Sequence, residues 1–251
     1  MGTVTVTATE NKIGFPIYDM HSHILPGVDD GCQTAEESLT LLRQSAAQGV
    51  GALFATPHFY PERSAEDFLQ SRAAAAETLR SVLPAEEALP PFALGAEVAY
   101  HPGLTDMDRL PELCLGKTGF LLLELPFYPW SRNLLRDVAA LQNYFGIQLI
   151  IAHIDRYLGG QDGAMIRELF SLDVAFQLNA EAVLSPRTAR KAKHLLKDGI
   201  ISLLGSDCHD PQRRPQRMGD AVEKLLSWHL DDAVREIGAF SRDLFDRSAG
   251  Q

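Results

Sequence analysis

The sequence predicts one α/β domain in which parallel strands alternate with helices and close into a barrel of seven units. The chain has 251 residues, a length that is normal for a single α/β barrel. Seven short apolar runs recur along it, several of them almost wholly apolar, as expected for parallel strands buried on both faces. Helical patterns separate the runs, and this alternation is typical of crossovers between parallel strands. The runs cover residues 15–20, 52–55, 92–96, 120–125, 147–152, 174–178 and 200–204.

Start and stop signals delimit the expected helices. Thr34 and Glu37 form a capping-box pattern at the start of the first helix. Ser185-Pro186 is typical of a helix that starts with a cap and a proline at its first position. An open, doubly wound sheet would instead require a glycine-rich loop after the first strand, and residues 20–24 are not one. The expected helices cover residues 34–48, 64–82, 131–145, 185–199, 215–228 and 231–240.

The composition limits the possible partners. Hydrophobic residues make up 45% and charged residues 22% of the chain, which is ordinary for a folded soluble protein. The formal net charge of −10 argues against a nucleic-acid partner, because phosphate binding needs clustered Lys and Arg, although a local basic pocket for one phosphate is compatible with it. No apolar run approaches the ~20 residues of a membrane helix, so membrane insertion is not expected.

The cysteines and the N-terminus suggest a location and a domain division. Three cysteines without a C-x-x-C pair do not form a disulfide framework, so a reduced, cytoplasmic protein is expected. The first residues lack the features of a secretion signal. We expect an N-terminal extension over residues 1–16, with a Thr-Val alternation at 3–9 that could form a short strand or a loose arm, and the barrel domain over 17–246.

Side chains of metal-ligating type follow the expected strands. Because functional groups gather at the C-terminal ends of the strands of a parallel barrel, these side chains are expected to share one opening. Residues two apart on a strand point the same way, so His21 and His23 can both face the opening, and so can Asp207 and His209. The sixth strand ends at Asn179. In chain order the candidate ligands are His21, His23, Asp30, His58, Glu97, Glu124, His153, Asp207 and His209.

The joint placement of these residues favours a metal site. Mixed imidazole and carboxylate ligation suits zinc, manganese or iron, and nine ligands fit a cluster of two or three ions better than one. Each residue alone has an ordinary explanation, since a single histidine at a strand end is usually structural and Asp29-Asp30 could belong to a turn. Glu124 ends an apolar run, where an unpaired charge would be costly. His194 and His229 are expected on the surface, and His101 is left unassigned.

Cys208 and Arg214 offer an alternative, because they satisfy C-x5-R, the spacing of cysteine-dependent tyrosine phosphatases. In those enzymes a thiolate attacks phosphorus and a glycine-lined loop of N–H groups holds the phosphate. Here no glycine lies between the two residues, Pro211 removes one N–H donor, and Asp207 would raise the pKa of the thiol. We therefore expect the spacing to be a coincidence.

The motifs around the candidate ligands carry a family resemblance. The most specific is His-x-His-Ile-Leu-Pro-Gly-x-Asp-Asp-Gly at residues 21–31. The chain resembles the PHP (polymerase and histidinol phosphatase) superfamily, and within it the CpsB/YwqE-type tyrosine-protein phosphatases of bacterial capsule and exopolysaccharide systems, over residues 17–215. The other motifs are Ala55-Thr-Pro-His58, Gly95-Ala-Glu97, Leu123-Glu-Leu-Pro-Phe127, Ala152-His153 with Arg156, and Ser206-Asp-Cys-His209 followed by Arg214.

The resemblance implies a distorted, TIM-barrel-like (β/α)7 barrel with a trinuclear site. The metal is often manganese in this family, with iron or zinc as alternatives. Arg156 and Arg214 would bind the phosphate. The three implied ligand sets are His21, His23, Glu97 and Asp207 for one ion, Glu97, Glu124 and His153 for a second, and Asp30, His58 and His209 for the third.

The ligand count and the two arginines motivate a mechanism in which a metal-bridging hydroxide attacks the phosphorus of protein phosphotyrosine. A tyrosine phenolate, with a pKa of about 10, leaves with little help, so Asp210 or a metal-bound water is only a weak candidate for the proton donor. By resemblance, the substrate would be the phosphorylated tail of a bacterial tyrosine kinase. The chain departs from the family at Ile154-Asp155, where Pro-Glu is usual, and at Phe59, where a second histidine is common, and both departures leave substrate preference open.

Three other functions are compatible with such a barrel. The same chemistry could act on a small phosphate ester such as histidinol phosphate. Amidohydrolases also begin with H-x-H, but they usually have eight strands and a lone aspartate at the last one. A regulatory barrel that has lost catalysis is the third possibility, although no expected ligand is missing from the sequence.

Overall fold

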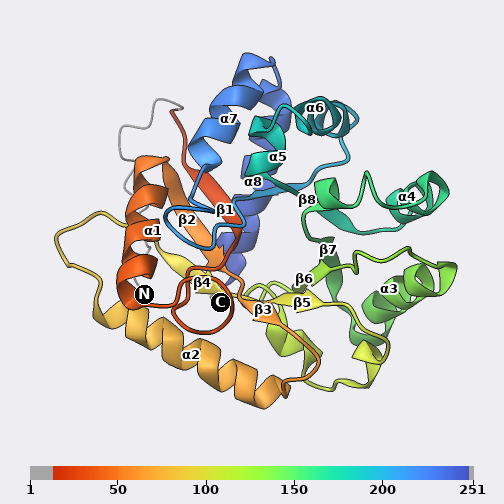
Figure 1. Ribbon diagram of the computed structural model, residues 1–251, viewed down its shortest axis with the longest axis horizontal. Coiled ribbons are helices and arrows are strands. Elements are labelled where there is room, and N and C mark those ends of the chain that lie inside the picture. Colours follow the sequence, from red (N-terminus) through yellow and green to blue (C-terminus); the bar gives the residue numbers. More distant parts are fainter. Residues whose placement is uncertain (1–13, 249–251) are drawn as a thin grey trace.

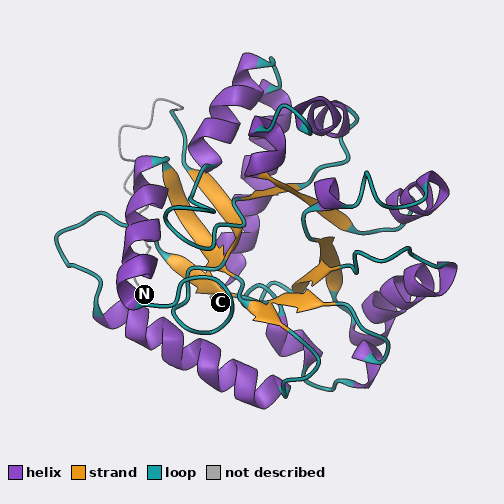
Figure 2. Cartoon of the chain, viewed as in Figure 1, coloured by secondary structure: helices purple, strands orange, loops and turns teal. Residues whose placement is uncertain are grey.

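A computed structural model describes residues 14–248 of the chain. The expected Thr-Val segment at residues 3–9 lies outside the described residues. Within them, strands form a ring at the centre and helices lie outside it (Figures 1 and 2). No helix of the described part of the chain is both long and apolar enough to cross a membrane.

All the paired strands are parallel, as the apolar runs predict. They form two hydrogen-bonded sheets, of order β1-β2-β4 and β3-β5-β6-β7-β8-β9. The strands are β1 (Ile17–Ser22), β2 (Val50–Ala55), β3 (His58–Phe59), β4 (Phe92–Leu94), β5 (Glu97–Ala99), β6 (Phe120–Glu124), β7 (Gln148–Ile151), β8 (Ala175–Asn179) and β9 (Leu203–Gly205).

Two of the seven expected strands are each followed, after a two-residue break, by a further short strand, which is why nine strands occupy seven positions. Strands β2 and β3 are separated by Thr56 and Pro57, and β4 and β5 by Gly95 and Ala96. Pro57 has no N–H to donate to a ladder, and this favours a break there. Hydrogen bonds still bridge the breaks, from Gly95 N to Ala55 O at 2.9 Å and from Glu97 N to Pro57 O at 3.1 Å. The interruptions therefore bend the barrel wall without opening it, and the expected distorted barrel is confirmed.

The first and last strands meet at a seam that closes the ring. Ser22 and Cys208 form a parallel bridge, and two backbone hydrogen bonds flank it. They run from His23 N to Cys208 O at 2.9 Å and from Asp207 N to His21 O at 2.8 Å. The contact joins segments that are more than 180 residues apart in sequence.

The barrel interior is filled by buried side chains. A buried cluster occupies it, and the helix α8 (Asp231–Ser248) closes the lower end of the barrel, where the strands begin. The rings of Phe54 and Phe245 lie 5.6 Å apart, and those of Phe120 and Phe240 are also 5.6 Å apart. Because this end is sealed, polar chemistry is confined to the opposite end of the strands. The cluster contains Tyr18, Met20, Ala52, Phe54, Leu115, Leu122, Ile150, Ala152, Leu203 and Leu244.

Most of the expected helices are present near their predicted ends. Thr34 caps α1 (Ala35–Ala47) in a capping box with Glu37, and Ser64 caps α2 (Ala65–Ser81). Ser131 caps α3 (Arg132–Phe145), which ends at Gly146 in the left-handed conformation. The helix expected over 215–228 is α7 (Met218–Ser227), and α8 extends beyond its expected end at residue 240 and past residue 246.

The helix start predicted at Ser185-Pro186 is wrong. Ser185 instead ends the short helix α5 (Ala180–Leu184), and α6 (Ala189–Lys197) begins four residues later. The backbone N–H of Ser185 bonds back to Glu181 O at 2.8 Å and ends α5, while its carbonyl oxygen accepts from Ala189 N at 2.9 Å, so a turn at residues 186–188 separates the serine from the first residue of α6. The helix α4 (Gly163–Phe170) and the 3-10 turns η1 (Leu104–Asp106), η2 (Leu110–Leu113) and η3 (Ile154–Arg156) were not expected.

Gly205 allows the closest packing around the first strand, and the substitution Gly205→Ala tests this. A Cβ at Gly205 would lie 2.5 Å from the Cβ of His21 and 2.8 Å from Nε2 of Gln177. We expect a loss of about 1–3 kcal/mol in the free energy of unfolding, the usual cost of overpacking. Gly238→Ala is the matched control, because nothing lies within 4 Å of its Cβ in helix α8 and alanine favours a helix there. Chemical denaturation that ranks the two variants the other way would contradict this account.

Candidate metal centre

All nine candidate ligands lie at one end of the barrel, where the strands end. His21 lies near the end of β1 and His23 just after it, while His58 starts β3 and Glu97 starts β5, each just after the break in its strand position. Met20 faces the sealed interior, and an irregular pairing between Asp19 and Ser22 turns His21 to the inside as well. Simple strand alternation would have placed these two neighbours on opposite faces.

The first expected ligand set converges on one point. The Nε2 atoms of His21 and His23 are 3.0 Å apart. Glu97 Oε2 lies 3.1 Å from the first of these atoms and 3.3 Å from the second. Asp207 Oδ1 lies 3.8 Å and 3.5 Å from the same two nitrogens. All four side chains are buried.

Glu97 connects this point to the second expected set. Its Oε1 lies 2.8 Å from His153 Nε2, and its Oε2 lies 3.0 Å from His58 Nδ1. Glu124 Oε1 is 3.2 Å from the same His153 nitrogen. One buried carboxylate thus contacts four imidazole rings, two through the first set and two beyond it.

The third expected set lies on the solvent side. Asp30 Oδ1 is 3.6 Å from His58 Nε2 and 3.5 Å from His209 Nε2. The aspartate side chain is 69% exposed, whereas His209 is 4% exposed. An anion that approaches the barrel mouth would therefore meet this set first.

The donor atoms that lie within 4.8 Å of one another form three overlapping groups. They differ slightly from the expected sets, since His23 joins the group on the solvent side and His58 joins the two glutamates in place of His153. The overlap makes the cluster continuous, while the assignment of each ligand to an ion remains a prediction. The groups are His23, Asp30, His58 and His209; His21, His23 and Asp207; and His58, Glu97 and Glu124.

In the neutral rings of His21 and His23, the hydrogen bonds made by Nδ1 leave the two Nε2 atoms without protons. The backbone N–H of His153 donates to Gln177 Oε1 at 2.7 Å, so this oxygen is an acceptor, and His21 Nδ1 at 3.1 Å must donate to it. In the same way His23 Nδ1 donates to Asp29 Oδ2 at 2.6 Å. Each ring then presents a lone pair at Nε2, and the two lone pairs face each other beside a carboxylate. A cation between them would turn this repulsion into attraction.

Several buried polar atoms of the cluster have no hydrogen-bond partner. They include Glu97 Oε2, His58 Nδ1 and His209 Nε2, and although the first two atoms lie 3.0 Å apart, the angles between them do not form a hydrogen bond. A buried polar atom without a partner costs free energy, and a native site rarely tolerates several of them together. The donors are of the imidazole and carboxylate types that bind zinc, manganese and iron, so the residues fit divalent metal ions.

Two of the candidate ligands have a left-handed backbone. The φ angles of His153 and Asp207 are 30° and 55°, which are unfavourable for residues other than glycine. Asp207 and His209 were expected to point the same way because they are two apart on one strand. That reason is wrong, because β9 ends at Gly205 and neither residue lies on a strand. The two side chains nevertheless lie together, with His209 Nδ1 3.5 Å from Asp207 Oδ1. Strain of this kind is common where the backbone must aim a side chain into a site.

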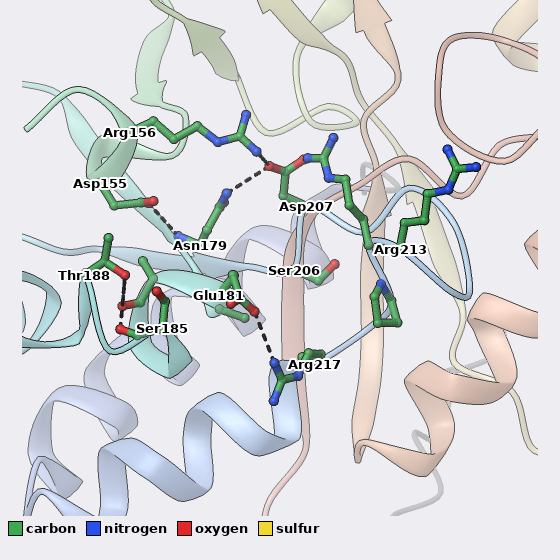
Figure 3. A pocket seen from close by; sticks show the side chains of 14 residues that line it. Asp155, Arg156, Asn179, Glu181, Ser185, Thr188, Ser206, Asp207, Arg213 and Arg217 are labelled. Atoms are coloured by element: carbon green, nitrogen blue, oxygen red, sulfur yellow. Dashed lines mark hydrogen bonds and ion pairs between the residues drawn. The ribbon is translucent and has the colours of Figure 1, made fainter. Parts of the chain in front are cut away.

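Arg156 and Arg214 both reach the cluster through Asp207. Arg156 Nη2 contacts Oδ2, and Arg214 Nη2 lies 2.6 Å from Oδ1 (Figure 3). The two arginines are 34% and 38% exposed, so part of each guanidinium group faces solvent. The structure thus places both expected phosphate-binding residues at the barrel mouth beside the donor cluster.

Asp210 is poorly placed for the role of proton donor. Its Oδ1 accepts hydrogen bonds from the backbone N–H groups of Gln212 at 2.9 Å and Arg213 at 2.6 Å. Desolvation acts to raise the pKa of Asp210, but these hydrogen bonds outweigh it and lower that pKa. A carboxyl group that stays ionised and holds a turn is a weak general acid.

Asp29 has a role in the site that was not predicted. Besides its bond to His23, its Oδ2 accepts from the backbone N–H of His58 at 2.8 Å. Burial acts to raise the pKa of Asp29, but His23 and the N–H donors lower it to about 2. The adjacent aspartates in the sequence were the signal that could have indicated this role. Asp29 orients the ring of His23, and Asp30 faces solvent.

Gln177 and Asn179 form a second orienting layer on β8. Gln177 Nε2 donates to Asn179 Oδ1 at 2.9 Å, and Asn179 Nδ2 donates to Asp207 Oδ2 at 2.9 Å. The sequence pattern indicates only Asn179, as the residue at the end of the sixth strand. The two-residue spacing of these amides within an otherwise apolar strand was the signal that could have identified Gln177.

Cys208 has none of the features of a nucleophile. It is fully buried, and burial together with Asp19 raises the pKa of its thiol well above its usual value. The N–H groups of the loop are also occupied, since that of His209 donates to Arg214 O at 3.0 Å, and those of residues 212 and 213 bond Asp210. No phosphate cradle exists between Cys208 and Arg214, which agrees with the expectation of a coincidence.

The remaining histidines lie outside the cluster. His194 and His229 are exposed, as expected. His101 lies between β5 and η1, and its Nδ1 is 2.9 Å from Pro102 O. Five of the eight histidines therefore belong to the candidate metal centre.

The fold and the donor cluster define the class of the protein as a parallel α/β barrel with an imidazole–carboxylate centre at its mouth. Comparison with known families is specific. The chain belongs to the CpsB/CapC family of capsular polysaccharide synthesis, whose family model matches residues 17–240.

Relatives in the family carry phosphatase names. The chain is 28% identical over 236 residues to the tyrosine-protein phosphatase CpsB of Streptococcus pneumoniae, a match that covers 87% of this chain and 93% of that protein. It is 26% identical over 225 residues to the tyrosine-protein phosphatase YwqE of Bacillus subtilis (strain 168), which covers 82% of this chain and 83% of YwqE.

Solved structures confirm the fold. A chain from crystal structures of YwqE from Bacillus subtilis and CpsB from Streptococcus pneumoniae, described as metal-dependent tyrosine phosphatases, matches with a TM-score of 0.78 at 22% identity and covers 91% of this chain and 94% of that chain. An inactive dihydroorotase-like domain from Chaetomium thermophilum matches at a TM-score of 0.55 and 12% identity, covering 92% of this chain and 79% of that chain. The second match shows that the same fold occurs in a domain that is described as inactive.

The burial of all three cysteines generates a chemical prediction. Cys32, Cys114 and Cys208 are free and buried, and burial raises the pKa of the first two thiols to about 12. We expect iodoacetamide at neutral pH to leave the native protein unmodified, because thiolate is the reactive form. Mass spectrometry should show three modifications after denaturation, as the control. Rapid modification of Cys208 in the native protein would restore the cysteine-dependent alternative.

Proposed function

We propose that the protein is a metal-dependent phosphatase that hydrolyses phosphotyrosine in proteins. The observation that carries the proposal is the convergence of nine imidazole and carboxylate donors beside two guanidinium groups at one barrel mouth. The phosphatase names of relatives that align along most of the chain support it.

Two or three divalent ions, with manganese first and iron or zinc as alternatives, would be held by the donors of the cluster. When bound, they would supply an activated water and neutralise charge on the phosphoryl oxygens. Gln177 keeps His21, and Asp29 keeps His23, in the tautomer that presents Nε2 to a cation. The expected ligands are His21, His23, Asp30, His58, Glu97, Glu124, His153, Asp207 and His209.

Arg156 and Arg214 would bind the non-bridging oxygens of the phosphate. Both are held at the mouth by Asp207 and keep solvent-facing N–H groups, which can form charge-assisted hydrogen bonds. Because Asp210 stays ionised, no protein side chain is assigned as the proton donor. This is compatible with a phenolate leaving group, whose low basicity makes protonation less necessary than for an alkoxide.

Exposed aromatic rings at the mouth favour an aromatic substrate over a small aliphatic phosphate ester. Tyr60 is 46% exposed and stacks on His58, with ring centroids 5.1 Å apart. Phe127 is 58% exposed and stacks on His153 at 6.1 Å. These rings lie over two candidate ligands on either side of Glu97, and exposed aromatic surface usually marks a binding site. A phenyl ring attached to the phosphate could pack between them.

The biological setting follows from the family. The capsular polysaccharide synthesis family and the names of its members support a role in capsule or exopolysaccharide regulation, with the phosphorylated tail of a bacterial tyrosine kinase as partner. Free, buried thiols fit a cytoplasmic location. We assign the phosphatase unit to residues 17–246 and treat residues 1–16 as an extension.

Metal removal tests the reaction. We expect EDTA to abolish the release of phosphate from a phosphotyrosine peptide and added Mn²⁺ to restore it, because the activated water depends on the ions. His21→Ala should reduce kcat by at least about a thousandfold with the fold retained by circular dichroism, since it removes a central donor. His194→Ala, which removes an exposed ring far from the cluster, is the control.

Other outcomes would redirect the proposal. Activity that survives EDTA but is lost on thiol alkylation would assign the reaction to Cys208. Metal-dependent activity on histidinol phosphate, with none on the peptide, would retain the metal site and change the substrate. Tight metal binding without hydrolysis of any phosphate ester would favour a regulatory barrel.

Phe127→Ala tests the aromatic wall. We expect KM for a phosphotyrosine peptide to rise up to about tenfold, because an aromatic contact of this kind contributes about 0.5–1.5 kcal/mol. The kcat/KM for histidinol phosphate, whose phosphate is on an aliphatic carbon, should change much less. Tyr144→Ala is the control, since Tyr144 is 66% exposed on helix α3 and belongs to no ligand's surroundings. Equal losses on both substrates would show that Phe127 supports the site without selecting the substrate.

A further inference from the structure

A second, positively charged pocket lies beside the candidate metal centre. It has a volume of about 270 Å³ and is enclosed by η3, α5 and the loop that leads into α7 (Figure 3). Ala180, Ala182 and Pro215 give it an apolar floor. Its polar walls carry four arginines, although the chain as a whole has a net charge of −10. These arginines are Arg156, Arg213, Arg214 and Arg217.

The three carboxylates of the pocket are already engaged. Asp155 Oδ1 accepts from Asn179 N at 3.1 Å. Asp207 receives the two arginines described above, and Glu181 Oε2 lies 3.2 Å from Arg217 Nη1. Glu181 and Asp207 therefore pair with three of the four arginines, and neither carboxylate pairs with a further cation of the pocket.

Arg213 supplies that further cation. Among the described residues, no carboxylate oxygen lies within 4.0 Å of its guanidinium group. Its backbone is fixed by the bond from its N–H to Asp210, so the side chain starts from a defined position at the pocket wall. In Figure 3 it extends along the side of the pocket opposite Arg156, while Arg217 is turned toward Glu181.

We propose that this pocket binds a second anionic group of the substrate, with Arg213 as its principal contact. The inference rests on the proposed function, because the pocket shares Arg156, Arg214 and Asp207 with the site of the scissile phosphate. A bound phosphate would thus occupy two of the arginines and leave Arg213 for a neighbouring anion. Histidinol phosphate has no such group, whereas a peptide can carry an acidic side chain or a second phosphoryl group next to the phosphotyrosine.

Binding of a flanking anion can be measured without turnover by using peptides that contain a non-hydrolysable phosphotyrosine analogue, phosphonomethyl-phenylalanine. Fluorescence anisotropy on the Mn²⁺-loaded protein would compare a peptide flanked by glutamates with one flanked by glutamines. We expect the wild type to bind the glutamate peptide about fivefold more tightly, as an exposed ion pair of about 1 kcal/mol allows. Raising NaCl to about 0.5 M should reduce this ratio by screening.

Three variants then locate the effect. Arg213→Ala should bring the ratio of the Kd values for the glutamine and glutamate peptides close to one. Glu181→Gln should increase it, because Arg217 then keeps only the contact of its Nε with Asp220 at 3.1 Å, and its Nη groups can contact the peptide. Arg235→Ala is the matched control, since it removes the same charge from a 66% exposed position on helix α8, and the ratio should persist.

The outcomes separate this proposal from the one on which it rests. A ratio near one in the wild type, or a ratio that Arg213→Ala leaves unchanged, would overturn the second anion site. A ratio that depends on Arg213, in a protein that hydrolyses no phosphotyrosine peptide, would support the site and refute the proposed reaction. A third peptide with two analogue residues identifies the source, because tighter binding than the glutamate peptide would assign the pocket to a second phosphoryl group.

Discussion

The structure depends on one electrostatic constraint, which is that two buried carboxylates and several imidazole lone pairs meet at the same point. Glu97 and Asp207 are 1% and 3% exposed, and both lie within 4 Å of the Nε2 atoms of His21 and His23. Such a group of electron pairs is unfavourable in a low-dielectric interior unless positive charge lies among them. The sealed lower end of the barrel, the left-handed residues and the orienting amides all serve to hold these donors in place.

The architecture and the site residues could largely be predicted because they follow simple periodic rules. Parallel strands buried on both faces read as apolar runs, and their C-terminal ends share one opening, so ligands far apart in sequence could be assigned to one place. The capping box at Thr34 and the glycine at 146 encode helix ends locally, and the structure confirms both. His21 and Glu97 could therefore be associated without any knowledge of their contacts.

The remaining features depend on the backbone and on neighbours that sequence does not display. The irregular pairing in β1, which lets Met20 and His21 face the same side, arises from contacts with β2 and the last strand. Ser185 matches the pattern of a helix N-cap, but it lies at the end of α5, because the residues before it form a helix. The function of Gln177 depends on three hydrogen bonds to groups 2, 24 and 156 residues away, and no local pattern indicates them.

The seam between β1 and the segment after β9 has a consequence for biosynthesis. His21 and His23 emerge from the ribosome early, whereas Asp207, His209 and the arginine at 214 are made near the end of the chain. Until the last strand docks, the early donors have no partners on the far side of the seam and Asp19 lacks the Ser206 hydroxyl that it bonds at 2.6 Å. The complete centre can therefore form only in a full-length barrel, so a nascent or truncated chain would be protected from premature phosphatase activity by topology alone.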